Sequence, residues 1–193
     1  MLVNKRILLI IAGGIAAYKG LELIRQLKDK GATVRCILTK AGSQFVTPLS
    51  VSALSGEKVY TDLFDHSEEA DIGHIRLSRE ADLIVVAPAT ADIIAKMASG
   101  LANGLASSAL LATNKPVLAV PAMNVEMWWH PATQRNIETL KNDGINVVGP
   151  ASGDLACGEV GIGRMIEIPK LISEISSLVN FLGSNIRAGK RAL

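Results

Sequence analysis

Short apolar runs alternate along the chain with segments whose apolar residues recur at helical spacing. The apolar runs predict strands at 6–12, 33–38, 82–87, 117–120 and 146–148. Unbroken aliphatic runs are typical of strands that are buried on both faces of a parallel sheet. Helices are predicted at 15–30, 41–54 with a break at Pro48, 88–100, 101–112, 132–143 and 169–182. The alternation predicts an α/β fold, a three-layer, doubly wound parallel sheet of the Rossmann or flavodoxin-like kind.

A glycine turn follows the first predicted strand and opens the first predicted helix. With the strand at 33–38 it makes a right-handed βαβ unit of about 30 residues. Backbone N–H groups at such a turn can bind an anion, so Gly13 and Gly14 are predicted to hold a mononucleotide phosphate. Thr39, at the end of the second strand, can reach the same place. A plain tight turn is the alternative interpretation.

The turn lacks the features of dinucleotide-binding proteins. Residues 13–17 read GGIAA rather than G-x-G-x-x-G. The second strand ends in Thr39-Lys40, where an acidic residue would be needed for a ribose hydroxyl. A nicotinamide-dependent oxidoreductase is therefore disfavoured.

Two later strands also end in turns that contain proline and polar residues. Thr90 and Asp92 follow the strand at 82–87, and either can cap the next helix or contact a phosphate. Asn124 follows Pro121, where the strand at 117–120 must stop. Its amide can donate and accept, although a helix cap is again the alternative. Because ligands in open α/β sheets bind beyond the carboxyl ends of the strands, these residues are expected to share one crevice.

Two regions between predicted elements carry further candidates. Residues 149–164 contain five glycines and are predicted to form a functional loop without a helix or a well-packed strand. Cys157 lies in this loop and is the better candidate for chemistry, whereas Cys36 lies inside a strand and is expected to be buried and inert. The polar segment 59–73 is predicted to be a surface excursion, and it ends at His74, a residue type that is more often structural when it stands alone.

Composition excludes several classes of protein. The length of 193 residues suits one domain, and 49% hydrophobic with only 4% aromatic residues indicates an aliphatic core. No apolar run is long enough to span a membrane and no secretory signal is recognisable, so a cytoplasmic protein is expected. The net charge of +2 is scattered, which argues against nucleic acid, and two cysteines are too few for a zinc site or a disulfide framework. The small-residue helix at 101–112 suits close packing inside the domain or against another subunit, and the adjacent Trp128 and Trp129 indicate an interface or a pocket wall. Together they argue against a monomer.

Five motifs, in this order and spacing, resemble those of the homo-oligomeric flavin-containing cysteine decarboxylases, and the resemblance covers residues 5 to about 182. The motifs are GGIAAYK at 13–19, GHI at 73–75, APATA at 87–91, PAMN at 121–124 and ACGEVGIGRM at 156–165. Within the family, the branch that decarboxylates 4′-phosphopantothenoylcysteine to 4′-phosphopantetheine in coenzyme A biosynthesis is the most similar. Gly20 and Asn103-Gly104 depart from the pattern of many relatives, but both lie outside the five motifs.

The resemblance implies an FMN-dependent lyase that requires no metal. The substrate would be oxidised to a thioaldehyde, lose CO₂ and be reduced as the enethiol, with His74 as base, Asn124 holding the carboxylate and Cys157 as proton donor. The implied cofactor contacts are Gly13, Gly14, Ile15, Thr39, Ala89, Thr90, Ala91, Asp92 and Ala122. The implied substrate contacts are Asn124, Met127, Cys157 and Gly158.

The resemblance also implies partners and boundaries. A homo-oligomer is expected, either a trimer or a dodecamer built of trimers. Residues 1–182 would form the decarboxylase domain, and residues 183–193 a linker or tail that begins a truncated phosphopantothenate–cysteine ligase domain. No nucleic acid or membrane partner is expected.

Three alternatives with a flavin remain. A peptidyl-cysteine decarboxylase and a flavin prenyltransferase belong to the same family, and the loop around Cys157 favours the coenzyme A enzyme over both. A flavin-binding regulatory subunit that inhibits a phosphatase is the alternative from another class. The presence of His74, Asn124 and Cys157, without a long acidic extension, argues against it.

Overall fold

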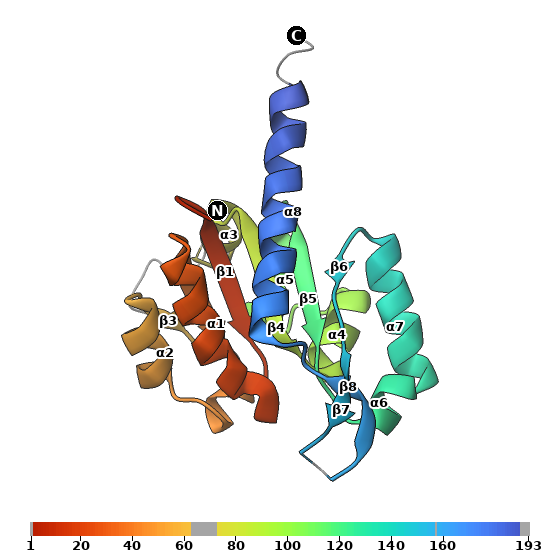
Figure 1. The fold of residues 1–193 in the computed structure, drawn as a ribbon. Coiled ribbons are helices and arrows are strands. Elements are labelled where there is room, and N and C mark those ends of the chain that lie inside the picture. The colour runs from red at the N-terminus through yellow and green to blue at the C-terminus, as the bar shows by residue number, and fades with distance from the viewer. Residues whose placement is uncertain (1, 63–72, 157, 190–193) are drawn as a thin grey trace.

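The computed structural model describes residues 2–62, 73–156 and 158–189, and within them a six-stranded parallel sheet forms the centre of the molecule (Figure 1). The strands lie in the order β3-β2-β1-β4-β5-β6, which is the Rossmann order, with the reversal between β1 and β4. This confirms the predicted fold class. The strands are β1 (Arg6–Ile11), β2 (Thr33–Leu38), β3 (Val59–Tyr60), β4 (Leu83–Ala89), β5 (Val117–Pro121) and β6 (Asn146–Val147).

Side chains that alternate along β1 divide the core into two layers. Ile7, Leu9 and Ile11 face one layer, whereas Leu8 and Ile10 face the other, and all five are buried. The first layer is covered by α1 (Tyr18–Asp29), α2 (Pro48–Ser55) and α8 (Ile168–Gly189). The second is covered by α3 (Gly73–Glu80), α4 (Ala91–Ala98), α5 (Leu105–Ala112), the short α6 (Val125–Trp129) and α7 (Pro131–Asn142). Burial on both faces explains why the strands read as unbroken apolar runs.

Helix starts follow local capping chemistry. Thr47 accepts a hydrogen bond from the Ser50 N–H group and places Pro48 in the first turn of α2. The predicted break at Pro48 is therefore correct, and the segment before it is a 3₁₀ turn, η2 (Gly42–Gln44), rather than a helix. A second 3₁₀ turn, η1 (Ile15–Ala17), leads into α1. The helix predicted from residue 101 begins only at Leu105.

Two segments contain strands that the sequence interpretation did not predict. The excursion predicted at 59–73 begins with a strand, because Val59 and Tyr60 pair with β2 at the edge of the sheet. The segment 149–164 was predicted to be a loop without a helix or a well-packed strand. The loop interpretation is wrong because strands form, although Gly163 is the one buried residue of the two strands. The segment forms an antiparallel pair, β7 (Ala151–Asp154) and β8 (Val160–Arg164). We call this pair, with its connecting turn, the arm.

The last helix runs further than its sequence pattern predicted. Its helical spacing was read to residue 182, but α8 continues to Gly189. In Figure 1 it starts beside the arm, runs along the sheet and projects past the amino ends of the strands. The domain boundary at 182 stays a prediction. Within the described ranges, no helix is both long and apolar enough to cross a membrane.

Candidate functional site

A cavity of about 990 Å³ lies at the carboxyl ends of the strands, on both sides of the reversal between β1 and β4. We call it the sheet-edge cavity. The predicted site residues that line it are Gly13, Gly14, Thr39, Thr90, Ala91, Asp92, Ala122 and Met127. They follow four different strands, so the topology alone brings them together. This is the place where open α/β sheets bind ligands.

The glycine turn after β1 disfavours a side chain at both of its positions, for different reasons. A Cβ atom at Gly13 would overlap the Ala41 side chain and lie 2.9 Å from the Ala41 carbonyl carbon. Gly14 has φ of 143°, a conformation that favours glycine. The turn therefore presents bare backbone to the sheet-edge cavity, directly before η1 and α1. Backbone of this kind is a suitable cradle for a phosphate group.

The two threonines that were predicted to bind the phosphate differ in whether their hydroxyl proton is available to a ligand. Thr39 Oγ1 accepts from the Gly42 N–H group at 3.0 Å and donates to the Ile11 carbonyl at 3.3 Å, so its proton is already engaged. Thr90 Oγ1 accepts from the Ile93 N–H group at 3.4 Å and caps α4. A hydroxyl that only accepts in its cap keeps its proton for a ligand oxygen. Thr90 is thus the better donor, and it can cap and bind together.

Ala89 contributes through its backbone. It is fully buried at the end of β4, and its carbonyl accepts a hydrogen bond from the Ala122 N–H group at 3.0 Å. This bond joins the turns that follow β4 and β5, and so it fixes the wall of the cavity. A direct contact between Ala89 and a cofactor stays a prediction.

A second cavity, of about 490 Å³, lies between the strand ends and the arm. We call it the arm cavity. Gly14 and Ala122 line both cavities, so the two adjoin. The predicted residues Ile15 and Asn124 lie on its wall. The sequence interpretation had given no role to other residues of its lining, which include Tyr18, Lys19, Asp154 and Arg164.

The cap at α6 orients the amide of Asn124. Its Oδ1 accepts from the Met127 N–H group at 2.8 Å, which makes Asn124 the N-cap of that helix. Its Nδ2 donates to Glu159 Oε2 of the arm at 3.4 Å. Asn124 lines the arm cavity, and because the acceptor end of its amide is used by the helix, the donor end is the part left for the arm or a ligand. The two interpretations of Asn124, a cap and a ligand-binding amide, are therefore compatible.

Glycines of β8 let the arm dock against the turn that carries Asn124. The Met123 N–H group donates to the Gly163 carbonyl at 2.9 Å. A Cβ atom at Gly163 would overlap the Met123 carbonyl oxygen, and one at Gly161 would lie 2.8 Å from Val125 Cγ2. The glycines thus serve a close backbone approach rather than a loop, which is why a strand forms where a loop was predicted.

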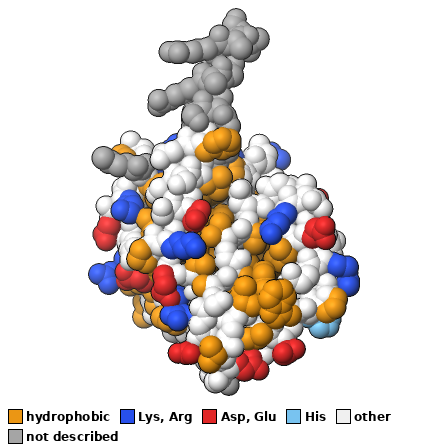
Figure 2. All heavy atoms as spheres, turned by 45° about the vertical axis from the view of Figure 1, so that its right-hand side comes forward, with side chains coloured by type: hydrophobic (Ala, Val, Ile, Leu, Met, Phe, Trp, Pro, Cys, Tyr) orange, Lys and Arg blue, Asp and Glu red, His pale blue; other side chains and the backbone are white. Residues whose placement is uncertain are grey.

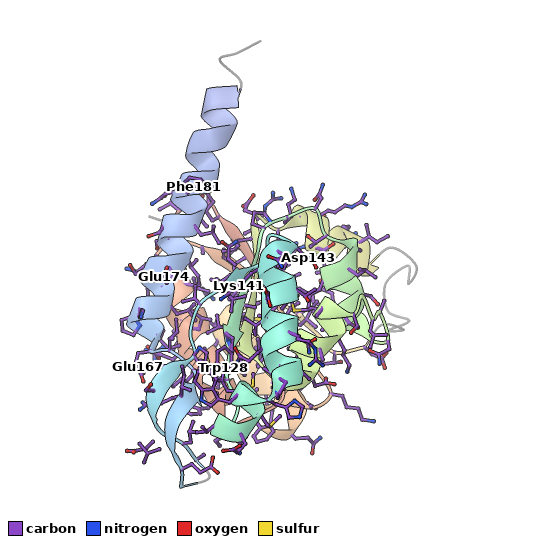
Figure 3. All side chains as sticks on the ribbon, turned by 90° about the vertical axis from the view of Figure 1, so that its right-hand side faces the viewer. Trp128, Lys141, Asp143, Glu167, Glu174 and Phe181 are labelled. Atoms are coloured by element: carbon purple, nitrogen blue, oxygen red, sulfur yellow. The ribbon has the colours of Figure 1, made fainter. Side chains whose placement is uncertain are left out.

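Lys19 connects α1 to the chain that leaves the arm. Its side chain is 9% exposed, and its Nζ donates to the Met165 carbonyl and to Glu167 Oε1, both at 3.2 Å. Arg164 binds the same Glu167 oxygen at 2.6 Å. Figure 3 shows Glu167 where the arm passes into α8. The sequence signal for this role was a lysine inside the first motif. Its partners lie more than a hundred residues away in sequence, so spacing could not identify them.

The remaining candidates divide by what the structure describes. Cys36 is fully buried, which confirms its prediction as a small buried residue, and burial raises the pKa of its thiol to about 12. His74 lies in the first turn of α3, but its side chain is outside the described part, and Cys157 lies outside the described residues altogether. Gly158 has φ of 86° in the turn of the arm. The described residues contain no cluster of three or more His, Cys, Asp or Glu suited to a metal ion.

Comparison with known proteins shows which family of proteins this chain is similar to. A model of the flavoprotein family matches residues 1–180. The coenzyme A biosynthesis bifunctional protein CoaBC of Vibrio cholerae is 48% identical over 192 residues, which is all of this chain but 47% of that protein. The chain thus spans about half the length of the curated relatives it matches.

Solved structures agree with this assignment. A cysteine-to-serine mutant of PPC decarboxylase, complexed with pantothenoylaminoethenethiol, is 33% identical with a TM-score of 0.81, over 91% of this chain and 98% of that one. The FMN-dependent cysteine decarboxylase SpaF is 28% identical with a TM-score of 0.79, over 93% and 99%. The chain belongs to the flavoprotein family, as its five motifs predicted.

Proposed function

We propose that this chain binds FMN and decarboxylates 4′-phosphopantothenoylcysteine to 4′-phosphopantetheine in coenzyme A biosynthesis. The observation that carries the proposal is the pair of adjoining cavities. One presents bare backbone and hydroxyl groups suited to a phosphate, and the other presents the amide donor of Asn124. Gly14 and Ala122 line both, so a cofactor held in the first can touch a substrate held in the second.

The described residues fit FMN. The Gly13-Gly14 backbone and the Thr90 hydroxyl would hold its phosphate, with Asp92 nearby at the start of α4. Ala122 and Ile15 would lie against the ring, since small and apolar side chains let a planar group approach the backbone. When bound, FMN supplies the chemistry that the side chains lack, accepting a hydride from the carbon that bears sulfur and returning it after CO₂ has left.

Asn124 would bind the substrate carboxylate through the outward Nδ2 of its amide. A neutral donor orients the carboxylate without stabilising its charge as strongly as a cation would, and strong stabilisation would oppose the loss of CO₂. The two cations in the lining of the arm cavity, Lys19 and Arg164, share Glu167 as a partner. Their charge is therefore partly balanced before any substrate arrives.

His74 and Cys157 keep the roles that the resemblance implies. His74 would take a proton in the oxidative half of the reaction, and Cys157 would return one to the enethiol in the reductive half. Ala156, which precedes Cys157, belongs to the lining of the arm cavity, and this supports a role for that segment at the substrate. Met127 and Gly158 are proposed as further substrate contacts.

The proposal includes partners beyond the substrate. We propose a homo-oligomer, a trimer or a dodecamer of trimers, because several large hydrophobic residues near the two cavities are exposed. They are Ile15, Phe45, Met127 and Trp129. Figure 2 shows hydrophobic side chains gathered in the middle of one face, with charged side chains around them. Fusion to a phosphopantothenate–cysteine ligase domain and a cytoplasmic location complete the proposal, since the matched relatives are bifunctional and about twice as long.

A spectrum and a gas measurement test this function. We expect purified protein to show the visible absorption of an oxidised flavin, and to release CO₂ when 4′-phosphopantothenoylcysteine is added. Cys157→Ser should still release CO₂ but form little 4′-phosphopantetheine. A flavin-loaded protein that releases no CO₂ would overturn the decarboxylase proposal in favour of a regulatory flavoprotein, and a protein that FMN cannot reconstitute would overturn both.

A further inference from the structure

Glu159 of the arm occupies the amide that the proposed function assigns to the substrate. Its Oε2 accepts from Asn124 Nδ2 at 3.4 Å. The acceptor is a carboxylate, which is the group that the substrate carries and that the product has lost. We propose that Glu159 is a specificity-determining residue that stands in for the substrate carboxylate on Asn124, before the substrate binds and again after CO₂ leaves. The inference rests on the proposed function.

The amide offers little choice about where a carboxylate can bind. Asn124 Oδ1 is held by the Met127 N–H group at 2.8 Å, so turning the amide over would break the cap of α6. Asn124 lines the arm cavity, and Nδ2 is the end of its amide that the cap does not use. Nδ2 carries two N–H groups, but a substrate carboxylate bound beside Glu159 would bring two negative charges together at one nitrogen. The two carboxylates repel each other, and they therefore compete for Asn124.

The backbone at Glu159 is held by hydrogen bonds, whereas its side chain is exposed. The Glu159 carbonyl accepts from the Leu155 N–H group at 2.8 Å, and the Leu155 carbonyl accepts from the Gly158 N–H group at 2.9 Å. Further along β8, Gly163 is bound to Met123. Glu159 itself is exposed. The proposed exchange at Asn124 therefore breaks the contact of the Glu159 side chain and leaves these backbone hydrogen bonds of the arm in place.

The exchange discriminates between substrate and product. A ligand with its own carboxylate must displace Glu159, and this weakens its binding by the strength of the contact. A ligand without a carboxylate leaves the contact intact. When CO₂ departs, the contact with Asn124 forms again, so the decarboxylated complex is stabilised relative to the substrate complex. The contact thus makes the protein bind the decarboxylated species more tightly than the substrate, and this favours the forward reaction.

The test compares two thiol-free ligands on the FMN-loaded protein, since neither can be oxidised to a thioaldehyde. One is 4′-phosphopantothenoylserine, which has the carboxylate, and the other is 4′-phosphopantothenoylethanolamine, which lacks it. Dissociation constants are measured by calorimetry for the wild type, Glu159→Ala and Glu159→Gln. Asp154→Asn is the matched control, because Asp154 is an arm carboxylate that lines the same cavity.

We expect Glu159→Ala to bind the serine ligand about two- to fivefold more tightly, the range for a long, exposed hydrogen bond. The ethanolamine ligand should bind as it does to the wild type. Glu159→Gln keeps an acceptor oxygen and should fall between the two proteins, whereas Asp154→Asn should change the ratio of the two constants less than about twofold.

Two outcomes separate this inference from the function on which it rests. If both ligands bind the wild type but Glu159→Ala leaves their ratio unchanged, or weakens the serine ligand, the stand-in role is wrong and the proposed function survives. If neither ligand binds the FMN-loaded wild type, the proposed function is overturned and the inference with it.

Discussion

The sheet-edge cavity and the arm cavity meet at Gly14 and Ala122, yet their walls are built differently. The first is walled by turns that follow strands buried in the core, and every residue of β4 is buried. The second is closed by the arm, whose strand β8 includes one buried residue, Gly163. Segments with few buried apolar contacts open at lower free energy than the core that supports them. The same site thus combines a rigid half and an adjustable half.

This difference assigns different tasks to the two halves. A cofactor that remains bound through every turnover suits the rigid wall, because the backbone cradle at Gly13-Gly14 is held by the core. A substrate that must enter and leave suits the arm, which is attached to the sheet through Met123 and, at its base, through Lys19 and Glu167. The comparison predicts that changes in one half leave the task of the other intact.

The largest effect is expected from Gly163→Ala. The new Cβ atom would overlap the Met123 carbonyl oxygen, and φ of 152° is itself unfavourable for alanine, so β8 must move away from Asn124. We expect kcat/KM for CO₂ release to fall at least about a hundredfold, the usual consequence of displacing a binding group by about 1 Å. FMN affinity should change little.

Gly144→Ala is the control for that variant. Gly144 also has a positive φ, but nothing lies within 4 Å of its Cβ position. It should share the backbone strain and keep its activity in the same CO₂ assay. Equal losses in both variants would mean that strain alone, rather than the displaced arm, causes the defect.

Asn124→Asp separates the cap from the ligand-binding amide. Aspartate caps helices as well as asparagine does, so the free energy of unfolding should change by less than about 0.5 kcal/mol. The donor is lost and a charge that repels the substrate carboxylate is gained, so kcat/KM should fall about thirty- to a hundredfold. Denaturant unfolding and CO₂ release measure the two parts. A loss of stability that matches the loss of activity would leave Asn124 as a cap only.

Gly13→Ala addresses the rigid half. Its Cβ atom would overlap the Ala41 side chain and push the two turns apart. We expect the dissociation constant for FMN to rise about tenfold, because overpacking a tight site usually costs about 1–3 kcal/mol. Flavin fluorescence quenching measures it. Gly20→Ala in α1 is the control, since there the new atom meets the movable end of Ile11 and FMN should bind normally.

The smallest effect is expected far from both cavities, at the amino end of the sheet. Burial alone would raise the pKa of Asp82, but hydrogen bonds from the Arg6 backbone and guanidinium hold that pKa below its usual range. The lowered pKa stabilises the fold above the unfolded value of about 4, and this stability disappears as the pH falls through the folded pKa. Asp82→Asn should therefore cost less than about 1 kcal/mol near neutral pH and nothing in strong acid, with CO₂ release unchanged. Urea unfolding from pH 7 to pH 2 measures the difference.

The strands and the turns that follow them could be predicted from sequence and the arm could not, for physical reasons. The strand at 33–38 was found with its correct bounds, and Thr90 and Asn124 were recognised as possible caps, because apolar runs and capping residues are local signals. The arm was missed because Gly161 and Gly163 are shaped by contacts with Val125 and Met123, which are distant in sequence.

Two further omissions have similar causes. The strand at Val59–Tyr60 is only two residues long and is defined by its pairing with β2. Lys19 was part of a recognised motif, but its role depends on Met165 and Glu167, which no spacing rule connects to it. Features set by neighbouring residues could therefore be predicted from the sequence, whereas contacts between distant segments could be found only in the structure.

The division between the two halves is tested most directly by adding FMN back. CO₂ release from 4′-phosphopantothenoylcysteine is measured for Gly13→Ala and Gly163→Ala at limiting and at saturating FMN, with the flavin spectrum recorded on the same samples. The account predicts that saturating FMN restores CO₂ release to Gly13→Ala, and that Gly163→Ala stays inactive although its flavin is fully bound. Recovery of Gly163→Ala by FMN, or a Gly13→Ala protein that stays inactive with its flavin fully bound, would contradict it.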